Sequence, residues 1–538
     1  MSQAAQDSSA NSGALYARLE ERILARDQVG ASAVYYDLVR AGRPLAEMVG
    51  QAVRIHAPYT HVPYHQRIDD GYPNFVNNDH CLLSARASLH LSKLLGGPMA
   101  ALPMAALPMA QTIWYIPTGL DIWNQKVGRA PGHYMRGFRG GPVQNPPPPQ
   151  IYWADQQPQR LEGPIRERLG HWLTLVERGE VIEAYRVFLG LMQDKPHRRE
   201  VLAELAFAGL IDVQDRMLYN RSYTTGHKAY RARATVEIGD AVGWDDAHDV
   251  LYAGALDIAV GPRWYSTYEM ACNVVKMFID GEALHAVPYG GASERETALL
   301  ANTAPLDAAE QAALIDALIR QPEPAYVEAI VKLLLAGKGP RQILDVIQIA
   351  AAQVVIETEK DTNFSMPQHC YEYCNTLGWF YDTFDHPLRL KLLFVAAAFL
   401  NRDAAHQRLT GDLNGGVPKA PAAAEGMSSA QLLDRVEGAV LSLHGPDSLA
   451  WTRAYLDTAA DRAPLVRRLA LTACRLGNDP HNQEIAQCML EDFGKNRSPD
   501  RDLLLLAAAQ HSAVHRKYGD PQEASRRFGQ ALGIDGLG

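Results

Sequence analysis

The segment ILDVIQIAAAQVV, residues 343–355, indicates the fold class most clearly. Its apolar side chains recur every three or four positions, at Ile343, Val346, Ile347, Ala350 and Val354. This spacing places them on one face of an α-helix, where they can be buried together. The segment therefore predicts a helix that packs against other helices.

The same spacing recurs along most of the 538-residue chain, whereas the alternation typical of strands is nearly missing. We therefore expect an all-α protein, built as a multi-helix bundle or as a helical-repeat array of antiparallel helix pairs. The stretches with helical spacing are 14–24, 44–55, 82–95, 165–175, 181–191, 200–209, 250–260, 267–278, 307–319, 326–335, 343–355, 388–400, 430–443 and 501–511.

Segments rich in proline and glycine interrupt the helical pattern. The tandem repeat PMAALPMAALPMA, which starts at Pro98, predicts a loop or broken turns, because a proline every five residues is incompatible with a regular helix. Residues 128–164 combine proline, glycine and aromatic side chains, and we expect this long arm to cover a pocket or a neighbouring subunit. The predicted regions are a disordered leader (1–13), an N-terminal helical region (14–127), the arm (128–164), a central helical domain (165–410), a linker (411–429) and a C-terminal helical region (430–538).

Composition and charge argue against several classes of protein. The chain has 52 Lys and Arg against 61 Asp and Glu, a formal net charge of -9, which disfavours a general electrostatic attraction to nucleic acid. No run reaches the roughly eighteen apolar residues that a membrane span needs. The N-terminus lacks the features of a secretory signal. Six cysteines are too few for a disulfide framework in a chain of this length, and we expect them to be free thiols in a reducing compartment. We therefore expect a soluble, cytoplasmic protein.

Histidines carry the main functional signal. Three of them follow aspartates just ahead of predicted helices, where the positive end of a helix keeps an imidazole neutral and available as a ligand or a base. Each has a second histidine seventeen to twenty-one residues upstream, in an aromatic setting. The pairs are His61/His80, His227/His248 and His369/His386. Two interpretations stay open: a degenerate repeat whose imidazoles converge, or polar residues that only cap and pack.

Residues 56–90 form the best candidate site, because tyrosines and asparagines there could orient a substrate. The candidates for substrate binding are Tyr59, Tyr64, Tyr72, Asn74 and Asn78, with Arg263 and Trp264 further along the chain. A metal such as zinc or non-haem iron could be held by His61, His65 and His80 together with Asp79. The catalytic candidates, as metal ligands or proton-transfer groups, are His61, His65, His80, His227, His248 and His386.

Two other histidine spacings have competing interpretations. Glu282 and His285 have the Glu-x-x-His spacing of di-iron carboxylate bundles, but such a bundle needs two copies and only one is evident. His511 and His515 lie four apart on a predicted helix, where we expect a solvated face. The chain also lacks the G-x-G-x-x-G, P-loop, G-x-S-x-G, H-E-x-x-H and C-x-x-C-H motifs, which argues against dinucleotide binding and c-type haem.

Histidines at helix entrances in a long, all-helical chain resemble the questin oxidase-like family. The resemblance covers about residues 50–410, although this chain has no adjacent pair of histidines. Members of that family are associated with oxidative ring opening of aromatic polyketides, so the resemblance implies an oxygenase with an aromatic-lined pocket. The residues that carry it are His61, His65, His80, His227, His248, His369 and His386.

These observations predict an all-helical oxidoreductase that acts on a small aromatic or planar organic substrate at a histidine-lined pocket able to hold iron or zinc. One alternative is a non-catalytic interaction protein or accessory subunit that uses residues 128–164 to form a homo-oligomer or to bind a partner subunit. The other is a metal-dependent hydrolase that would use the same residues. Neither nucleic acid nor a membrane is an expected partner.

Overall fold

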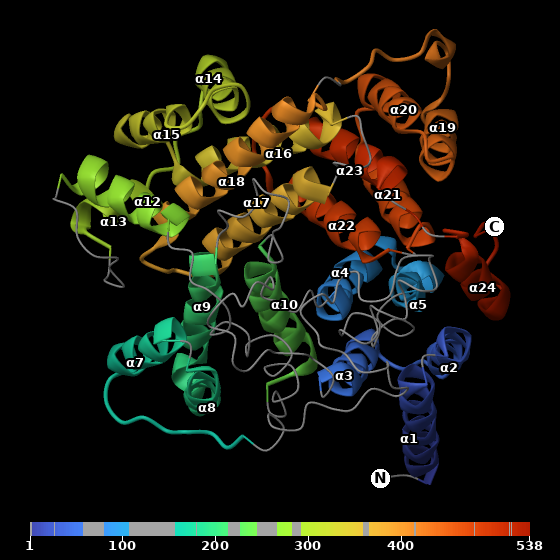
Figure 1. Cartoon of the computed structure of the whole chain (residues 1–538). Coiled ribbons are helices and arrows are strands. Elements are labelled where there is room, and N and C mark those ends of the chain that lie inside the picture. The colour runs from blue at the N-terminus through green and yellow to red at the C-terminus, as the bar shows by residue number, and fades with distance from the viewer. Residues whose placement is uncertain are drawn as a thin grey trace.

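Helices account for nearly all the regular structure in the computed structural model of the protein (Figure 1). The structure describes residues 3–25, 27–57, 80–106, 156–178, 180–212, 226–244, 266–281, 292–358, 365–413, 416–477, 479–515, 517 and 519–537. Within these residues it has 22 α-helices and no strand, besides two isolated β-bridges. The predicted all-α fold is therefore confirmed.

The helices are labelled in chain order in Figure 1. Their bounds are α1 (Gln3–Leu24), α2 (Gln28–Arg40), α3 (Leu45–His56), α4 (His80–Leu95), α5 (Leu102–Ala106), α7 (Ile165–Arg178), α8 (Val181–Met192), α9 (Arg198–Ala208), α10 (His227–Val242), α12 (Ser266–Val274), α13 (Glu294–Leu300), α14 (Ala308–Ile319), α15 (Ala325–Leu335), α16 (Pro340–Glu357), α17 (Ser365–Thr383), α18 (Arg389–Thr410), α19 (Ser429–Leu441), α20 (Gly445–Thr458), α21 (Ala463–Arg475), α22 (Pro480–Lys495), α23 (Asp502–Val514) and α24 (Glu523–Leu532). Short 3₁₀ turns are Gly97–Ala101, Lys195–His197, Gly209–Asp212 and Ala422–Ala424, and a π-helical turn, Val275–Asp280, continues α12.

The irregular segments agree with the prediction in part. The proline repeat forms a 3₁₀ turn at 97–101 and then the short helix α5, so broken turns are confirmed over its described part. Helix α1 begins at Gln3, inside the segment predicted as a disordered leader, and its alanines and glutamines favour helix. The predicted helix 250–260 and residues 128–155 of the arm lie outside the described residues. The end of the arm runs beside α8, where Gln159 N donates to Arg186 O at 2.8 Å.

Four helices from distant parts of the chain lie next to one another (Figure 1). Helix α4 packs on α10, α10 on α17, α17 on α22, and α22 again on α4, which closes a ring. Near their first turns, the ring of His369 lies 5.3 Å from that of His227 and 5.0 Å from that of His481. About two turns further along, Arg233 Nη1 donates to Asn375 Oδ1 at 2.5 Å. Helices α10, α17 and α22 therefore run in the same direction.

Helix α4 follows that direction too. At the histidine end Ser84 Oγ donates to Glu484 Oε1 at 2.7 Å, and toward the far end His90 Nε2 lies 3.0 Å from Glu237 Oε1. Helix α23 runs the opposite way, because its C-terminal His511 donates from Nε2 to the carbonyl oxygen of His481 at the start of α22, at 2.8 Å. The ring thus has the N-terminal ends of four helices, and the C-terminal end of a fifth, gathered at one place.

Apolar contacts hold this arrangement from outside. Helices α16 and α18 pack on α17, and α23 packs on both α16 and α22. Most residues of α16 and α18 are buried, so these two helices form a layer of the core on the outer side of the ring. In the part of the chain that the structure describes, no helix combines the length and the apolar character needed to cross a membrane.

Candidate metal centre

A carboxylate and two imidazoles meet at the start of α22. Asp479 is the N-cap of this helix: its Oδ1 accepts a hydrogen bond from His481 N at 3.1 Å, and Pro480 occupies the first helical position. The same oxygen lies 2.7 Å from His481 Nδ1 and 3.0 Å from His515 Nε2. The potential ligand atoms of these three residues all lie within 4.8 Å of one another. The side chains of His481 and His515 are only 17% and 11% exposed, so the group is close to solvent without facing it.

Hydrogen bonds from neighbouring helices orient this group. Gln368 Nε2 on α17 donates to His515 Nδ1 at 2.8 Å, which assigns the proton of that ring to Nε2, the nitrogen beside Asp479. The backbone of His481 is held from the other side by the ring of His511. Gln368 thus orients the ring of His515, and His511 holds the backbone of His481.

The imidazoles continue as a row through the interior. Consecutive rings lie 5.0–5.5 Å apart, centre to centre. The row runs in the order His227, His369, His481, His515 and His511. Three separate parts of the chain, in α10, in α17 and at 481–515, thus supply five histidines to one place.

The pKa values of Asp479, His481 and His515 are shifted in different directions. Burial by itself lowers the pKa of His481, but Asp479 and the carboxyl groups of Glu484 and Glu372 raise it to about 9. Burial raises the pKa of Asp479, yet the imidazoles of His515 and His481 outweigh this and hold it well below its usual value. Burial lowers the pKa of His515 to about 4. At pH 7 the metal-free centre is therefore an Asp479–His481 ion pair beside a neutral His515.

Two more carboxyl groups lie one helical turn along. Glu372 follows His369 by three residues on α17, and Glu484 follows His481 by three residues on α22, so each pair shares a helix face. Burial raises the pKa of Glu372 to about 8, with Glu484 as the next cause. Burial also raises the pKa of Glu484 to about 7. Both groups are 1% exposed or less.

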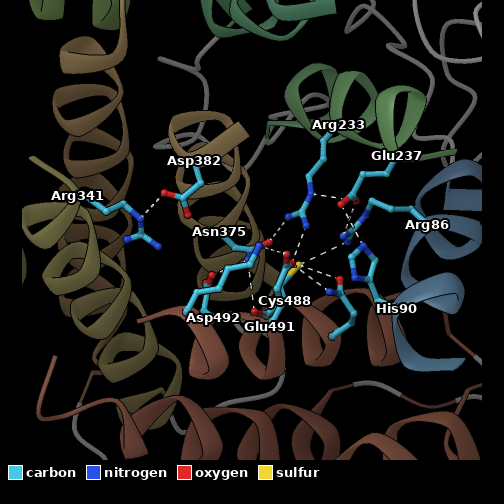
Figure 2. Close-up of polar contacts among 12 residues, drawn as sticks. Arg86, His90, Arg233, Glu237, Arg341, Asn375, Asp382, Cys488, Glu491 and Asp492 are labelled. Carbon is cyan, nitrogen blue, oxygen red and sulfur yellow. Dashed lines mark hydrogen bonds and ion pairs between the residues drawn. The ribbon is translucent and has the colours of Figure 1, made fainter. Parts of the chain in front are cut away.

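A second polar cluster lies further along the ring (Figure 2). Arg233 Nε lies 3.2 Å from Glu237 Oε2 and Arg233 Nη2 lies 2.6 Å from Glu491 Oε2, while Arg86 Nη1 is 3.6 Å from Glu237 Oε2. Burial raises the pKa of Glu237, but Arg233 and His90 outweigh it and lower the pKa to about 2. His90, Glu237 and Glu491 could hold a metal by distance alone. Because guanidinium groups already compensate both carboxylates, we interpret this cluster as a structural ion network.

The described residues include few of the predicted site residues. His227 and its predicted relative His369 lie in the histidine row. His80 is the first residue of α4, at the same end of the ring, and nothing of its side chain is described. The remaining candidates on residues 58–79 and 245–265 lie outside the described residues: His61, His65, His248, Asp79, Tyr59, Tyr64, Tyr72, Asn74, Asn78, Arg263 and Trp264. Glu282 and His285 also lie outside them.

His386 occupies a different place from the histidine row. Its Nε2 lies 3.0 Å from Glu204 Oε1, and its ring stacks on Phe207 at 3.8 Å. The expected aspartate cap is also absent here, since α18 begins only at Arg389 and Asp385 contacts the Arg389 side chain. Its described contacts are those of a packed polar residue between α9 and α18.

Sequence reasoning missed most of the residues that form the centre. The expectation of a solvated face for His511 and His515 is wrong, because α23 is buried on every side and His511 is fully buried. The useful signal is the reverse of Glu-x-x-His: the spacing His-x-x-Glu occurs at His369, at His481 and, on the surface, at His197. Asp479, two residues before His481, has no such signal beyond its capping position.

Two imidazoles and one carboxylate on one side of an ion can hold iron or zinc and leave positions open for other ligands. Tyr230 and Tyr373 are buried beside the histidine row, and the ring of Tyr230 lies 5.4 Å from that of His227. Comparison with family models, curated proteins and solved structures found no match for the chain.

Proposed function

We propose that the protein is an iron-dependent oxidoreductase of the oxygenase type, which binds the metal through Asp479, His481 and His515. The observation that carries this proposal is the approach of two imidazoles and one carboxylate to within 4.8 Å of one another. Two histidines and a carboxylate with open positions are the donor set of non-haem Fe(II) oxygenases. Bound iron would supply a place where dioxygen and the substrate are activated together.

The chain's own residues have defined parts in this proposal. Asp479 is held by its capping bond, and Gln368 orients the ring of His515. His481 carries a proton in the metal-free centre, and the proton of the neutral His515 ring lies on Nε2, the nitrogen beside Asp479. Both nitrogens must therefore be freed of their protons before they can bind a metal. Metal affinity is therefore expected to rise with pH.

A small aromatic or planar substrate is the class that the sequence predicts. Tyr230, whose hydroxyl donates to the carbonyl oxygen of His369 at 2.6 Å, and Tyr373 are buried aromatic side chains near the His227 end of the histidine row. Dioxygen is the oxidant, and no other reductant is needed when both of its atoms enter the substrate. The family resemblance of the sequence points to the same class of reaction.

The test is metal retention followed by oxygen uptake. Metal-free protein is loaded with Fe(II) under anaerobic conditions, passed through a desalting column and analysed for iron. We expect the wild type to retain iron. His515→Ala should retain at least roughly tenfold less iron per chain than the wild type, because it lacks one ligand. His197→Ala is the matched control, because His197 lies 3.0 Å from Glu200 in a surface His-x-x-Glu pair.

The retained iron should support oxygen consumption with members of a panel of phenolic and polycyclic aromatic compounds. Iron retention that is equal in the wild type and in His515→Ala would reject the proposed ligands. A centre that selects zinc and catalyses hydrolysis without oxygen would favour the hydrolase alternative, for which the buried Glu372 could serve as a carboxylate base. Assembly through residues 128–164 stays a prediction, to be tested by the mass of the protein in solution.

A further inference from the structure

The side chain of Gln368 contacts the proposed metal centre on the side away from the carboxylate. Its Nε2 lies 2.8 Å from Nδ1 of His515, while Nε2 of His515 lies 3.0 Å from Oδ1 of Asp479. The two nitrogens of an imidazole ring are distinct and point in different directions. His515 therefore presents Nε2 to the other ligand atoms of the centre and Nδ1 to helix α17.

This contact fixes the position of the proton on the ring of His515. The amide Nε2 of Gln368 is a donor, and a neutral imidazole accepts at Nδ1 only when its proton is on Nε2. A neutral ring that offers Nε2 to a metal carries its proton on Nδ1 instead. Nδ1 is then a donor that faces a second donor. The hydrogen bond of the metal-free protein therefore cannot persist once His515 binds a metal.

Gln368 also carries the acceptor that the other tautomer of His515 needs. Its Oε1 makes no hydrogen bond among the described residues, although Gln368 is only 1% exposed. Buried polar atoms without a hydrogen bond are rare in folded proteins and call for an explanation. The last torsion of a glutamine side chain is roughly two-fold, so half a turn exchanges Oε1 with Nε2 and leaves the rest of the side chain in place. In the reversed amide, Oε1 can accept the proton of Nδ1.

The surroundings leave the amide as the part that can turn. Gln368 lies near the start of α17, a helix that packs on α16, α18 and α22. The ring of His515 lies between those of His481 and His511, at 5.2 and 5.5 Å from centre to centre. Both the backbone of Gln368 and the imidazole are therefore held by packing, and reversal of the amide is the smallest movement that serves the second tautomer.

We propose that Gln368 is a positioning residue, which reverses its side-chain amide when His515 binds a metal and thereby holds that ring in its metal-binding tautomer. This inference rests on the proposed function, which supplies the ion at Asp479, His481 and His515. Metal-binding histidines generally have a partner on the second nitrogen, most often a carboxylate, a carbonyl group or water. An amide differs from a carboxylate or a carbonyl group, because it can serve the ring in both tautomers.

Zinc is the probe for the position of the proton, because it is diamagnetic and binds the same kinds of donor as iron. Full-length protein labelled with nitrogen-15 in histidine is observed by nuclear magnetic resonance before and after addition of Zn(II). The ring of His515 is recognised by its absence from the spectrum of His515→Ala. We expect its proton on Nε2 in the metal-free wild type and on Nδ1 in the zinc-loaded wild type.

Zinc affinity, measured by competition with a chelator, tests the role of the acceptor. Gln368→Met fills a similar space without an acceptor and should bind zinc roughly 10–100-fold more weakly than the wild type. Gln368→Glu keeps an acceptor for Nδ1 and should bind zinc at least as tightly as the wild type. Gln193→Met is the control and should leave the affinity unchanged, because Gln193 is an exposed residue whose Oε1 accepts from Arg160 Nε at 3.1 Å.

The outcomes separate this inference from the proposed function. A His515 ring with its proton on Nδ1 in both forms overturns the reversal of the amide and leaves the metal centre intact, as do equal zinc affinities for the wild type and Gln368→Met. A proton that stays on Nε2 after zinc is added, or a wild type that binds no zinc, overturns both. If the Gln368 variants do not fold, as judged by circular dichroism, the two spectra of the wild type decide the question alone.

Discussion

Replacing Arg233 by methionine tests the interior ion network most severely. The Arg233 side chain is 1% exposed, and it serves Glu237 at 3.2 Å and Glu491 at 2.6 Å (Figure 2). Its Nη1 also donates to Asn375 Oδ1 at 2.5 Å. Methionine keeps much of the apolar stem but leaves both carboxylates without their main cation.

The expected cost follows from these contacts. Removing one partner of a buried ion pair destabilises a protein by about 3–5 kcal/mol. Arg233 compensates two carboxylates, but His90 lies 3.0 Å from Glu237 and Lys495 lies 2.6 Å from Glu491, so part of the charge stays paired. We therefore expect Arg233→Met to lower the free energy of unfolding by about 3–5 kcal/mol at pH 7.

The pH dependence gives the same prediction a second check. Burial raises the pKa of Glu237, but Arg233 and His90 together lower it from 4.5 to about 2. The stability that this lowering contributes is present above pH 4.5 and is lost as the pH falls toward 2. The difference between the wild type and Arg233→Met should therefore shrink as the pH falls below 4.5.

The assay is urea unfolding followed by circular dichroism at several pH values. Arg453→Met is the control, because Arg453 pairs with Asp457 on the surface, where both side chains are over 40% exposed and such pairs contribute about 1 kcal/mol or less. The double variant Arg233→Met/Glu491→Gln should recover part of the loss. A loss for Arg233→Met no larger than that of the control would refute the network.

Three further predictions concern single side chains. Burial raises the pKa of Glu372 from 4.5 to about 8. As the pH rises between these values, the free energy of unfolding of the metal-free wild type should therefore fall relative to that of Glu372→Gln, by up to about 1.4 kcal/mol per pH unit. Parallel urea-unfolding profiles would contradict this. Asp479→Asn should lower the pKa of His481 from about 9, seen in the imidazole resonances of metal-free protein, and an unchanged titration would count against the ion pair. His386→Ala should cost about 1–3 kcal/mol in thermal unfolding without changing metal retention, and loss of the metal would show that His386 belongs to the centre.

The predicted helical stretches overlap most of the described helices, but α2, α20, α21 and α24 have no predicted counterpart. Helices α10, α17 and α22 were not predicted either, and these three bury their polar faces. In α10 the charged side chains of Lys228, Arg231 and Arg233 are all buried. Periodicity treats polar residues as outward-facing, so a helix with a polar inward face shows no clear stripe.

The histidines predicted at helix entrances were His80, His248 and His386, whereas those found in the first turns of α10 and α22 are His227 and His481. Pairing by nearness in sequence failed for His369 and His386. His369 lies in the first turns of α17, a helix of 19 residues and about 28 Å, whereas His386 follows three residues after its end.

The partners of His369 come instead from α10 and α22, more than a hundred residues away in either direction. Such contacts depend on how helices pack, and no local spacing encodes them. The spacing His-x-x-Glu would have drawn attention to α17 and α22, but the surface pair at His197 has the same spacing. Burial distinguishes the three copies, and burial follows from the tertiary fold.

Anomalous diffraction from crystals loaded with Fe(II) would show whether these three side chains bind the metal. We expect a peak at the iron absorption edge between Asp479, His481 and His515, at about 2.0–2.2 Å from their ligand atoms. Iron-loaded crystals with clear density for these three side chains and no anomalous peak among them would contradict it.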